Sequence, residues 1–296
     1  MVARDFLAEL ERRVLIFDGS MGANLQSLEL TAEDFGGIRF EGCMDALCLT
    51  RPDAPARLHE GFLNAGCDVI ETNTFQASRL RLEEWGLADK THAINYSGAA
   101  IARAQCDIFE RTDGRPRFVA GAIGPTGFLP SSDDPTLSNI TFAQLLETFE
   151  EQTRGLLEGG ADLLIIETQQ DILETKAAIL GARRCFAQAG RSIPLQVQVS
   201  LDTNGRMLLG TDVGAALAIL EGLDADIIGL NCSTGPEHMR EPIRFLVQNT
   251  RKPISVIPNA TERDLEALGR AMRRSLFAAM LDPSVTPDEL RDERRK

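Results

Sequence analysis

Residues 160–168 read Gly-Ala-Asp-Leu-Leu-Ile-Ile-Glu-Thr, a short apolar run that an aspartate precedes and a glutamate follows. Two further stretches share this layout, residues 66–72 (Gly-Cys-Asp-Val-Ile-Glu-Thr) and residues 224–232 (Asp-Ala-Asp-Ile-Ile-Gly-Leu-Asn-Cys). We interpret each as a loop, an entering Asp, a buried strand and a polar exit. Continuous apolar runs of this length are typical of strands buried on both faces of a parallel sheet. The weak internal repeat therefore favours a fold built from βα units.

Seven apolar runs of this kind alternate with helical stretches. A helix is predicted from Phe142, because a capping box at Thr141 and Gln144 precedes apolar residues at helical spacing, and it is predicted to end at Gly159–Gly160. Such alternation predicts an α/β fold, and we favour a (β/α)8 barrel of the TIM type over an open, doubly wound sheet. The seven runs are Val14–Phe17, Cys67–Glu71, Phe118–Ile123, Leu163–Glu167, Leu195–Leu201, Ile227–Leu230 and Ile254–Ile257.

The eighth strand of such a barrel has the weakest support in the sequence. Residues 261–281 have the pattern of one long amphipathic helix, although residues 275–281 could serve as a strand. We therefore expect a barrel domain over residues 1–281, with its eighth strand degraded or missing, and a charged tail over residues 282–296. The 296 residues suffice for one such domain, because α/β barrels typically need roughly 250.

The charge and composition of the chain exclude several kinds of binding partner. The net charge of −13 disfavours nucleic acid and anionic membranes, because phosphate-binding surfaces need clustered Lys and Arg. The apolar run Val14–Phe17 is too short for a signal sequence or a membrane span, so we expect a cytoplasmic protein. The six cysteines show no CxxC spacing, which favours reduced thiols over a disulfide framework. Small molecules and protein partners remain.

Polar residues follow the predicted strands directly. In α/β barrels the chemistry lies at the carboxyl ends of the strands, here called the mouth, where the loops converge. Carboxylates at that depth are costly to bury unless they bind a cation or accept hydrogen bonds, so their clustering favours a ligand with a cationic group such as an amino group. In the alternative interpretation, Asp18 and Glu167 only tie loops together by accepting backbone N–H bonds. The strand exits are Asp18, Glu71-Thr72-Asn73-Thr74, Gly124-Pro125-Thr126, Glu167-Thr168, Asp202, Asn231-Cys232-Ser233 and Pro258-Asn259.

Two interpretations of Cys232 stay open. A single Cys after an apolar strand is usually a small buried hydrophobic residue, whereas at a barrel mouth it is a candidate thiolate nucleophile or metal ligand. His238 lies in the predicted opening turn of the next helix and is interpreted as a surface residue. His59 and His92 lie in helical stretches, and core or surface roles are favoured for both.

Missing features exclude several reactions. Phosphoryl transfer, dinucleotide redox chemistry and serine hydrolysis are disfavoured, because no Walker loop, GxGxxG after a strand, HExxH or GxSxG occurs. A Schiff-base aldolase is disfavoured because every lysine is away from the strand exits. The four lysines are Lys90, Lys176, Lys252 and Lys296.

These strand exits resemble those of one known family. Over residues 14–260 the chain looks like the homocysteine S-methyltransferases, and it is most similar to the homocysteine-binding module of their cobalamin-dependent branch. The motifs that carry the resemblance are, in order, Asp18-Gly19-Ser20-Met21-Gly22, Glu71-Thr72-Asn73-Thr74-Phe75, Gly124-Pro125-Thr126, Glu167-Thr168, Gly229-Leu230-Asn231-Cys232 with Gly235-Pro236, and Pro258-Asn259-Ala260.

The resemblance implies a zinc-thiolate mechanism. Family members hold Zn²⁺ through a cysteine that matches Cys232 and through an adjacent Cys-Cys pair at the end of the eighth strand, with the homocysteine sulfur as a further ligand. Coordination deprotonates the thiol, and the thiolate attacks a methyl group carried by methylcobalamin. The residues that the resemblance assigns to homocysteine are Asp18 and Glu167 for its amino group, and Glu71, Thr72 and Asn231 for the pocket walls.

The chain departs from the family's pattern after Ala260. The Gly-Gly-Cys-Cys-Gly-Thr-Thr-Pro segment of the family is absent, and an alignment anchored on Thr286-Pro287 places Asp282-Pro283 at the cysteine pair. No cysteine follows Cys232, so this chain alone does not supply a three-cysteine zinc site. Asp282 is the one candidate oxygen ligand at that position.

Three functions stay open on these observations. The first is methyl transfer to the zinc-activated thiol of homocysteine, giving methionine, with methylcobalamin on a corrinoid partner, since we expect no cobalamin module in this chain. The second is a truncated or metal-free homologue that binds an amino acid without catalysis. The third is a metal-independent enzyme with Glu71 and Glu167 as acid and base. The polar strand exits favour the first function, and the lost cysteine pair favours the second.

Overall fold

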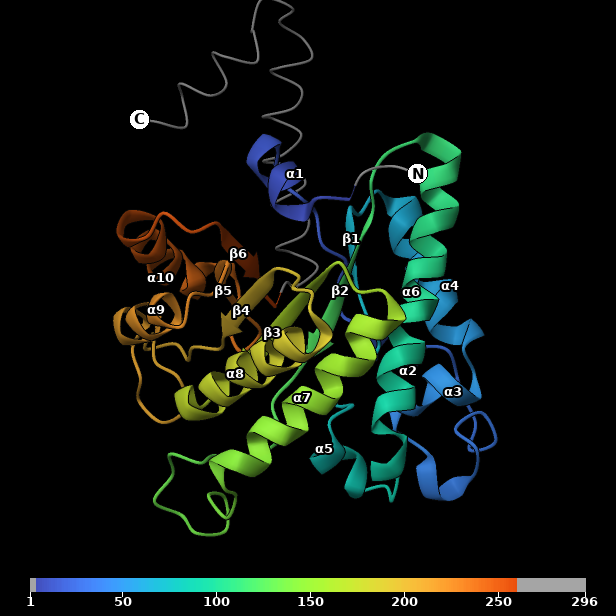
Figure 1. Ribbon diagram of the computed structural model, residues 1–296, viewed down its shortest axis with the longest axis horizontal. Coiled ribbons are helices and arrows are strands. Elements are labelled where there is room, and N and C mark those ends of the chain that lie inside the picture. The colour runs from blue at the N-terminus through green and yellow to red at the C-terminus, as the bar shows by residue number, and fades with distance from the viewer. Residues whose placement is uncertain (1–3, 260–296) are drawn as a thin grey trace, which may run out of the picture.

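The computed structural model describes residues 4–259 of the chain. Its centre is one parallel sheet in which the strands lie side by side in chain order. The sheet curls into part of a barrel, and helices cover its outer side (Figure 1). This is the α/β, TIM-type fold that the sequence predicts. The strands are β1 (Val69–Glu71), β2 (Phe118–Ile123), β3 (Leu163–Gln169), β4 (Leu195–Val199), β5 (Ile227–Asn231) and β6 (Ile254–Ile257).

Each strand is joined to the next through at least one helix, as parallel pairing requires. The predicted capping box is present: Thr141 accepts from the Gln144 backbone N–H at 3.2 Å, and the Gln144 side chain accepts from the Thr141 N–H at 2.9 Å. The helices are α1 (Phe6–Arg12), α2 (Met21–Gln26), α3 (Leu47–Thr50), α4 (Asp53–Ala65), α5 (Arg79–Glu83), α6 (Thr91–Asp113), α7 (Phe142–Gly159), α8 (Ile172–Ala189), α9 (Val213–Gly222) and α10 (Pro236–Asn249), with short 3₁₀ turns η1 (Ile38–Phe40), η2 (Met44–Ala46) and η3 (Ala88–Lys90).

Two apolar layers hold the sheet. The outer layer lies between the strands and the helices, and α6, α7 and α8 pack against one another in sequence over it. The inner layer fills the concave side of the sheet, and Phe6 of α1 closes its amino-terminal end with an edge-on contact to Phe118, 5.2 Å between ring centroids. Since apolar side chains occupy the interior, the polar strand exits collect at the opposite end. The inner layer contains Phe6, Leu15, Val69, Phe118, Ala120, Ala122, Leu163, Ile165 and Ile227.

The first predicted strand, Val14–Phe17, is not a regular strand. Phe17 forms a single parallel bridge with Val69 of β1, and the Asp18 N–H donates to the Val69 carbonyl at 3.0 Å. The outward side chains of Val14 and Ile16 are 64 % and 46 % exposed. Among residues 4–259 the segment pairs only with β1, so the ladder stays too short to form a strand, although it occupies the first strand's position.

Several predictions concern the chain after Asn259. The amphipathic helix over residues 261–281, the alternative strand over residues 275–281 and the domain boundary at residue 281 lie outside the described residues. Within residues 4–259, no helix combines the length and the apolar character needed to cross a membrane.

We expect Gly229→Ala to destabilise the protein, because a methyl group at Gly229 would lie 2.2 Å from the carbonyl oxygen of Ser255 on β6. That atom is part of the backbone of the adjacent strand, so relief requires β5 and β6 to separate. The expected loss in the free energy of unfolding is about 1–3 kcal/mol, measured by urea denaturation. Gly222→Ala at the end of α9 is the control, since nothing lies within 4 Å of the added carbon. Equal stability of the two variants would contradict the close approach of β5 and β6.

Candidate functional site

Three predicted carboxylates lie together at the mouth. Asp18 follows the segment beside β1, Glu71 ends β1, and Glu167 lies in β3. Both carboxylate oxygens of Asp18 accept the backbone N–H of Glu71, at 3.0 and 3.1 Å. The charges of Glu71 and Asp18 both act on Glu167. Asp18 and Glu167, 149 residues apart in the chain, thus bring their acidic side chains to one place, as the strand exits predict.

Burial raises the pKa of all three carboxyl groups. For Glu71 the cause is loss of solvation alone, and for Asp18 the charge of Glu71 adds to it. For Glu167 the charges of Glu71 and Asp18 add to burial, while hydrogen bonds from Thr168 and Asn231 oppose it. In the described part of the chain, no Lys, Arg or His acts on any of the three pKa values. The cluster is therefore a group of buried carboxyl groups that lacks a cationic partner among the described residues.

The carboxylates have two predicted roles, binding a cationic ligand and tying loops together, and the contacts differ from one residue to the next. Asp18 does accept backbone N–H bonds, so it ties the first segment to β1 as well as facing the cluster. Glu167 instead accepts a side-chain bond, from Asn231 Nδ2 at 3.0 Å. Glu71 keeps a buried Oε1 that has no hydrogen-bond partner within residues 4–259. A buried, unpartnered carboxylate oxygen is costly, and a hydrogen-bond donor of a bound ligand would satisfy it.

Thr72 lies beside the cluster but its hydroxyl is engaged. It accepts the N–H of Ala122 on β2 at 2.9 Å and shares a hydrogen bond with the Thr74 hydroxyl at 2.6 Å. The Thr74 hydroxyl in turn donates to the Ala122 carbonyl at 2.8 Å. In this arrangement Thr72 joins the end of β1 to β2 and so holds Glu71 in place.

Cys232 follows β5 and is the one partly exposed thiol among the six free cysteines. Burial raises its pKa above the ordinary value, and the charges of Glu167 and Glu71 raise it further, whereas the Thr168 hydroxyl lowers it. Reactive cysteines lie in electropositive surroundings, and here the neighbouring charges are negative. The protein alone therefore keeps this thiol protonated at neutral pH.

The donor set for a metal is small. No three His, Cys, Asp or Glu side chains within residues 4–259 are grouped so that they could hold a metal ion. The other five cysteines are buried, and Asp282 lies outside the described residues. One thiol beside a carboxylate cluster does not match the three-thiolate zinc site that the family resemblance implies.

The remaining histidines and lysines are placed as the sequence predicts. His238 is exposed on α10, His59 is buried in α4, and the His92 ring contacts Glu158 at 2.9 Å on the surface. Among the described lysines, Lys252 pairs with the exposed Asp224 at 3.0 Å. The described lysines Lys90, Lys176 and Lys252 belong to η3, to α8 and to the turn before β6, respectively.

Two residues at this end of the barrel went unassigned in the sequence. The sequence identifies Thr168 as part of a strand exit and of a family motif but predicts no role for it, and its hydroxyl lies 2.8 Å from Asn231 Nδ2 and 3.6 Å from Cys232 Sγ. Glu174 of α8 is fully buried and accepts the backbone N–H of Thr126, at 2.7 Å, and its hydroxyl. Burial raises the pKa of Glu174 to about 7. Neither role has a local sequence signal, because the partners lie 63 and 48 residues away.

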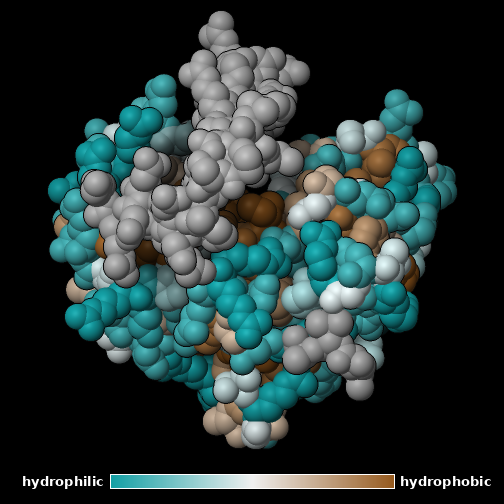
Figure 2. Space-filling model, turned by 90° about the horizontal axis from the view of Figure 1, so that it is seen from above, coloured by the Kyte–Doolittle hydropathy of each residue, from teal (hydrophilic) through white to brown (hydrophobic). Residues whose placement is uncertain are grey.

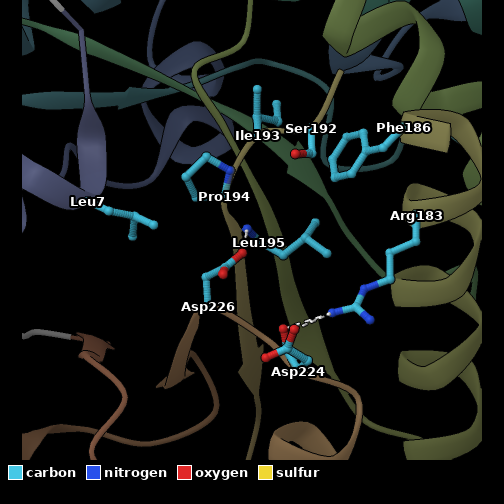
Figure 3. A pocket seen from close by; sticks show the side chains of 9 residues that line it. All are labelled: Leu7, Arg183, Phe186, Ser192, Ile193, Pro194, Leu195, Asp224 and Asp226. Atoms are coloured by element: carbon cyan, nitrogen blue, oxygen red, sulfur yellow. Dashed lines mark hydrogen bonds and ion pairs between the residues drawn. The ribbon is translucent and has the colours of Figure 1, made fainter. Parts of the chain in front are cut away.

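A cavity of about 400 Å³ lies at the other end of the strands, between α1, the end of α8 and the starts of β4 and β5 (Figure 3). Arg183 and Asp224 form an ion pair at its edge, 3.7 Å apart. Seen from the side of α1, hydrophobic side chains gather at the hollowed centre of the surface, with hydrophilic ones around them (Figure 2). Barrel chemistry lies at the carboxyl ends of strands, so we do not assign the site to this cavity.

The curled parallel sheet and the acidic mouth define a class: a TIM-type α/β barrel with a cluster of buried carboxyl groups at the strand ends. A family model described as homocysteine S-methyltransferase matches residues 15–286. The chain belongs to the homocysteine S-methyltransferase family.

Relatives agree with this assignment. The chain is 44 % identical over 256 residues to methionine synthase from Mycobacterium leprae (strain TN), and 43 % identical over 256 residues to that from Mycobacterium tuberculosis (strain ATCC 25618 / H37Rv). Each match covers 86 % of this chain but 21 % of the relative. The fold resembles the metallated homocysteine methyltransferase MmuM from Escherichia coli, with a TM-score of 0.72, 19 % identity, and coverage of 89 % of this chain and 90 % of that one.

Proposed function

We propose that the mouth binds homocysteine and that the chain serves in methylating its sulfur to give methionine. The observation that carries the proposal is the cluster of Asp18, Glu71 and Glu167, three buried carboxylates with raised pKa values. An ammonium group entering the cluster supplies the cation that the described residues lack. The family membership selects homocysteine among amino acids with such a group.

In this proposal the amino group and the sulfur occupy neighbouring subsites. Asp18 and Glu167 hold the amino group, and Glu71, Thr72 and Asn231 form the pocket walls. The ligand sulfur lies towards Cys232, because the side chain of Asn231 contacts both Glu167 Oε2, at 3.0 Å, and Cys232 Sγ, at 3.5 Å. Orientation of the thiol is the contribution that these residues make to methyl transfer.

Zinc is the part of the family mechanism that this chain fits least. Cys232 is the one cysteine that is not buried, and Asp282 is the only further ligand proposed. Because this donor set does not match a three-thiolate centre, we derive no step through zinc. As the S–C bond to the methyl group forms, the bond between the methyl group and its donor must break and the thiol proton of homocysteine must leave. Glu71, whose Oε1 has no partner among the described residues, is the proposed acceptor of that proton.

The methyl donor is proposed to be methylcobalamin on a partner protein or module. The matched methionine synthases extend well beyond the region shared with this chain, since the shared region is 21 % of their length. Methylation of homocysteine needs a donor that presents a methyl group at the mouth. We propose a corrinoid protein for that role.

Zinc content and turnover test the proposal together. Purified protein is assayed for bound zinc with and without homocysteine, and for methylation of homocysteine by free methylcobalamin. We expect methionine to form, and we expect Cys232→Ala to remove any bound zinc. Cys67→Ala is the control, because that thiol is buried and donates to the Phe17 carbonyl. Homocysteine binding without zinc and without turnover would instead identify a metal-free homologue that binds an amino acid.

A further inference from the structure

Three residues around the mouth have strained backbones. Thr168 has φ +57°, Cys232 has φ +55° and Ser233 has φ +61°, all in the left-handed region. A β-branched residue there is a rare outlier, and such positions persist only where the surroundings enforce them. The pairing of β3 with β4 also shifts register between Ile166 and Gln169, so the distortion includes the end of the strand that carries Glu167.

Asn231 holds both distorted segments. Its Oδ1 accepts the backbone N–H of Thr168 at 2.8 Å, and its Nδ2 donates to the Thr168 hydroxyl at 2.8 Å. The same Nδ2 lies 3.0 Å from Glu167 Oε2 and 3.5 Å from Cys232 Sγ. The Asn231 side chain is almost fully buried, so these contacts are shielded from water.

The Thr168 hydroxyl has one proton left to donate. Its oxygen already accepts from Asn231, and the remaining neighbours are Glu167 Oε2 at 3.4 Å and Cys232 Sγ at 3.6 Å. The hydroxyl therefore lies between the carboxylate that faces the ligand amino group and the sulfur at the other subsite. Glycine or asparagine would adopt this φ at a lower energetic cost. The contacts of the threonine hydroxyl are therefore the reason for a strained threonine at this position.

We infer that Thr168 is a positioning residue that, through Asn231, fixes the Glu167 carboxylate and the Cys232 sulfur relative to each other. The distance between these two groups determines how well one amino acid can contact Glu167 with its amino group while its sulfur lies near Cys232. The inference rests on the proposed function for its ligand, homocysteine. It adds a residue outside the set assigned to substrate or metal, and a reason for the left-handed backbone at Thr168.

The first test separates binding from stability. Homocysteine affinity is measured by calorimetry under reducing conditions for Thr168→Val, Thr168→Ser and Thr168→Gly, together with the melting temperature of each. We expect Thr168→Val to weaken binding at least about tenfold and Thr168→Ser to stay within about threefold of the parent, because only serine keeps the hydroxyl. Thr168→Gly loses the hydroxyl but relieves the backbone, so it should weaken binding without lowering the melting temperature.

A second readout needs no ligand. Hydrogen exchange of residues 163–171 and 227–235 should accelerate in Thr168→Val and stay unchanged in Thr168→Ser. Thr153→Val is the control, since the buried hydroxyl of Thr153 has no partner in the described part of the chain. It should leave binding and exchange unchanged.

The outcomes distinguish the inference from the proposed function. Parent protein that fails to bind homocysteine overturns the proposed function, while accelerated exchange in Thr168→Val still supports the positioning role. Unchanged exchange in Thr168→Val, or equal losses of affinity for Thr168→Ser and Thr168→Val, overturns the positioning role whatever the ligand.

Discussion

Replacing Glu167 by glutamine is expected to weaken homocysteine binding by about 2–4 kcal/mol, roughly thirty- to a thousand-fold in the dissociation constant. The reason is the site's charge: Glu167 is buried, and no cation acts on its pKa in the described part of the chain. A ligand ammonium group paired with that carboxylate is shielded from water. When glutamine replaces Glu167, the buried ammonium group loses its negatively charged partner. Asp18→Asn should have an effect in the same range. Calorimetric titration with L-homocysteine measures both.

Asp202→Asn provides the matched control. Asp202 also follows an apolar strand run, but it is exposed and accepts the backbone N–H groups of Asn204 and Arg206, at 2.8 and 3.0 Å. Its replacement should leave homocysteine affinity unchanged. If Glu167→Gln binds homocysteine as tightly as the parent chain, the carboxylate supports the loop ends only, and the amino-group subsite is wrongly placed.

The pH dependence of binding follows from the same groups. Each carboxyl of the cluster holds its proton to a higher pH than it would in water, and the pKa of Glu71 is raised to about 7. An ammonium ligand prefers the ionised cluster, so binding must displace protons at lower pH. Homocysteine affinity is therefore expected to fall as the pH drops below about 7.

The strand exits could be predicted because they follow from a simple physical rule. Strands buried on both faces carry apolar residues throughout, so the first polar residue marks the strand end, and parallel strands end on the same side. Asp18, Glu71 and Glu167 were located in this way, and the structure brings their charges together. The strand predicted over residues 14–17 was wrong, because a regular strand requires pairing with neighbouring strands and not only apolar residues.

The contacts around Thr168 could not be predicted. Its left-handed backbone depends on the side chain of Asn231, which lies 63 residues further along the chain. Local sequence favours extended backbone for threonine, so tertiary contacts override propensity here. The cysteine pair that the family resemblance implies is the opposite case, because its absence after Cys232 in these 296 residues can be seen in the sequence without the fold.

The second large effect concerns Glu174, whose carboxylate anchors the loop after β2 through the backbone N–H and hydroxyl of Thr126. Burial raises its pKa from 4.5 to about 7, so the native protein keeps a proton that the unfolded chain releases. The free energy of unfolding therefore falls as the pH rises from about 4.5 to about 7. At about 1.4 kcal/mol per pH unit, the loss is at most about 3.5 kcal/mol.

Glu174→Gln cannot ionise, so it should lose this component of the pH dependence and gain stability relative to the parent chain on going from pH 4.5 to pH 8. The glutamine oxygen can still accept the Thr126 N–H, which preserves the loop anchor. Urea denaturation at both pH values measures the difference, with Glu147→Gln on the exposed side of α7 as the control. Parallel stability curves for Glu174→Gln and the parent would mean that burial does not raise the pKa of Glu174 in the native protein above its value in the unfolded chain.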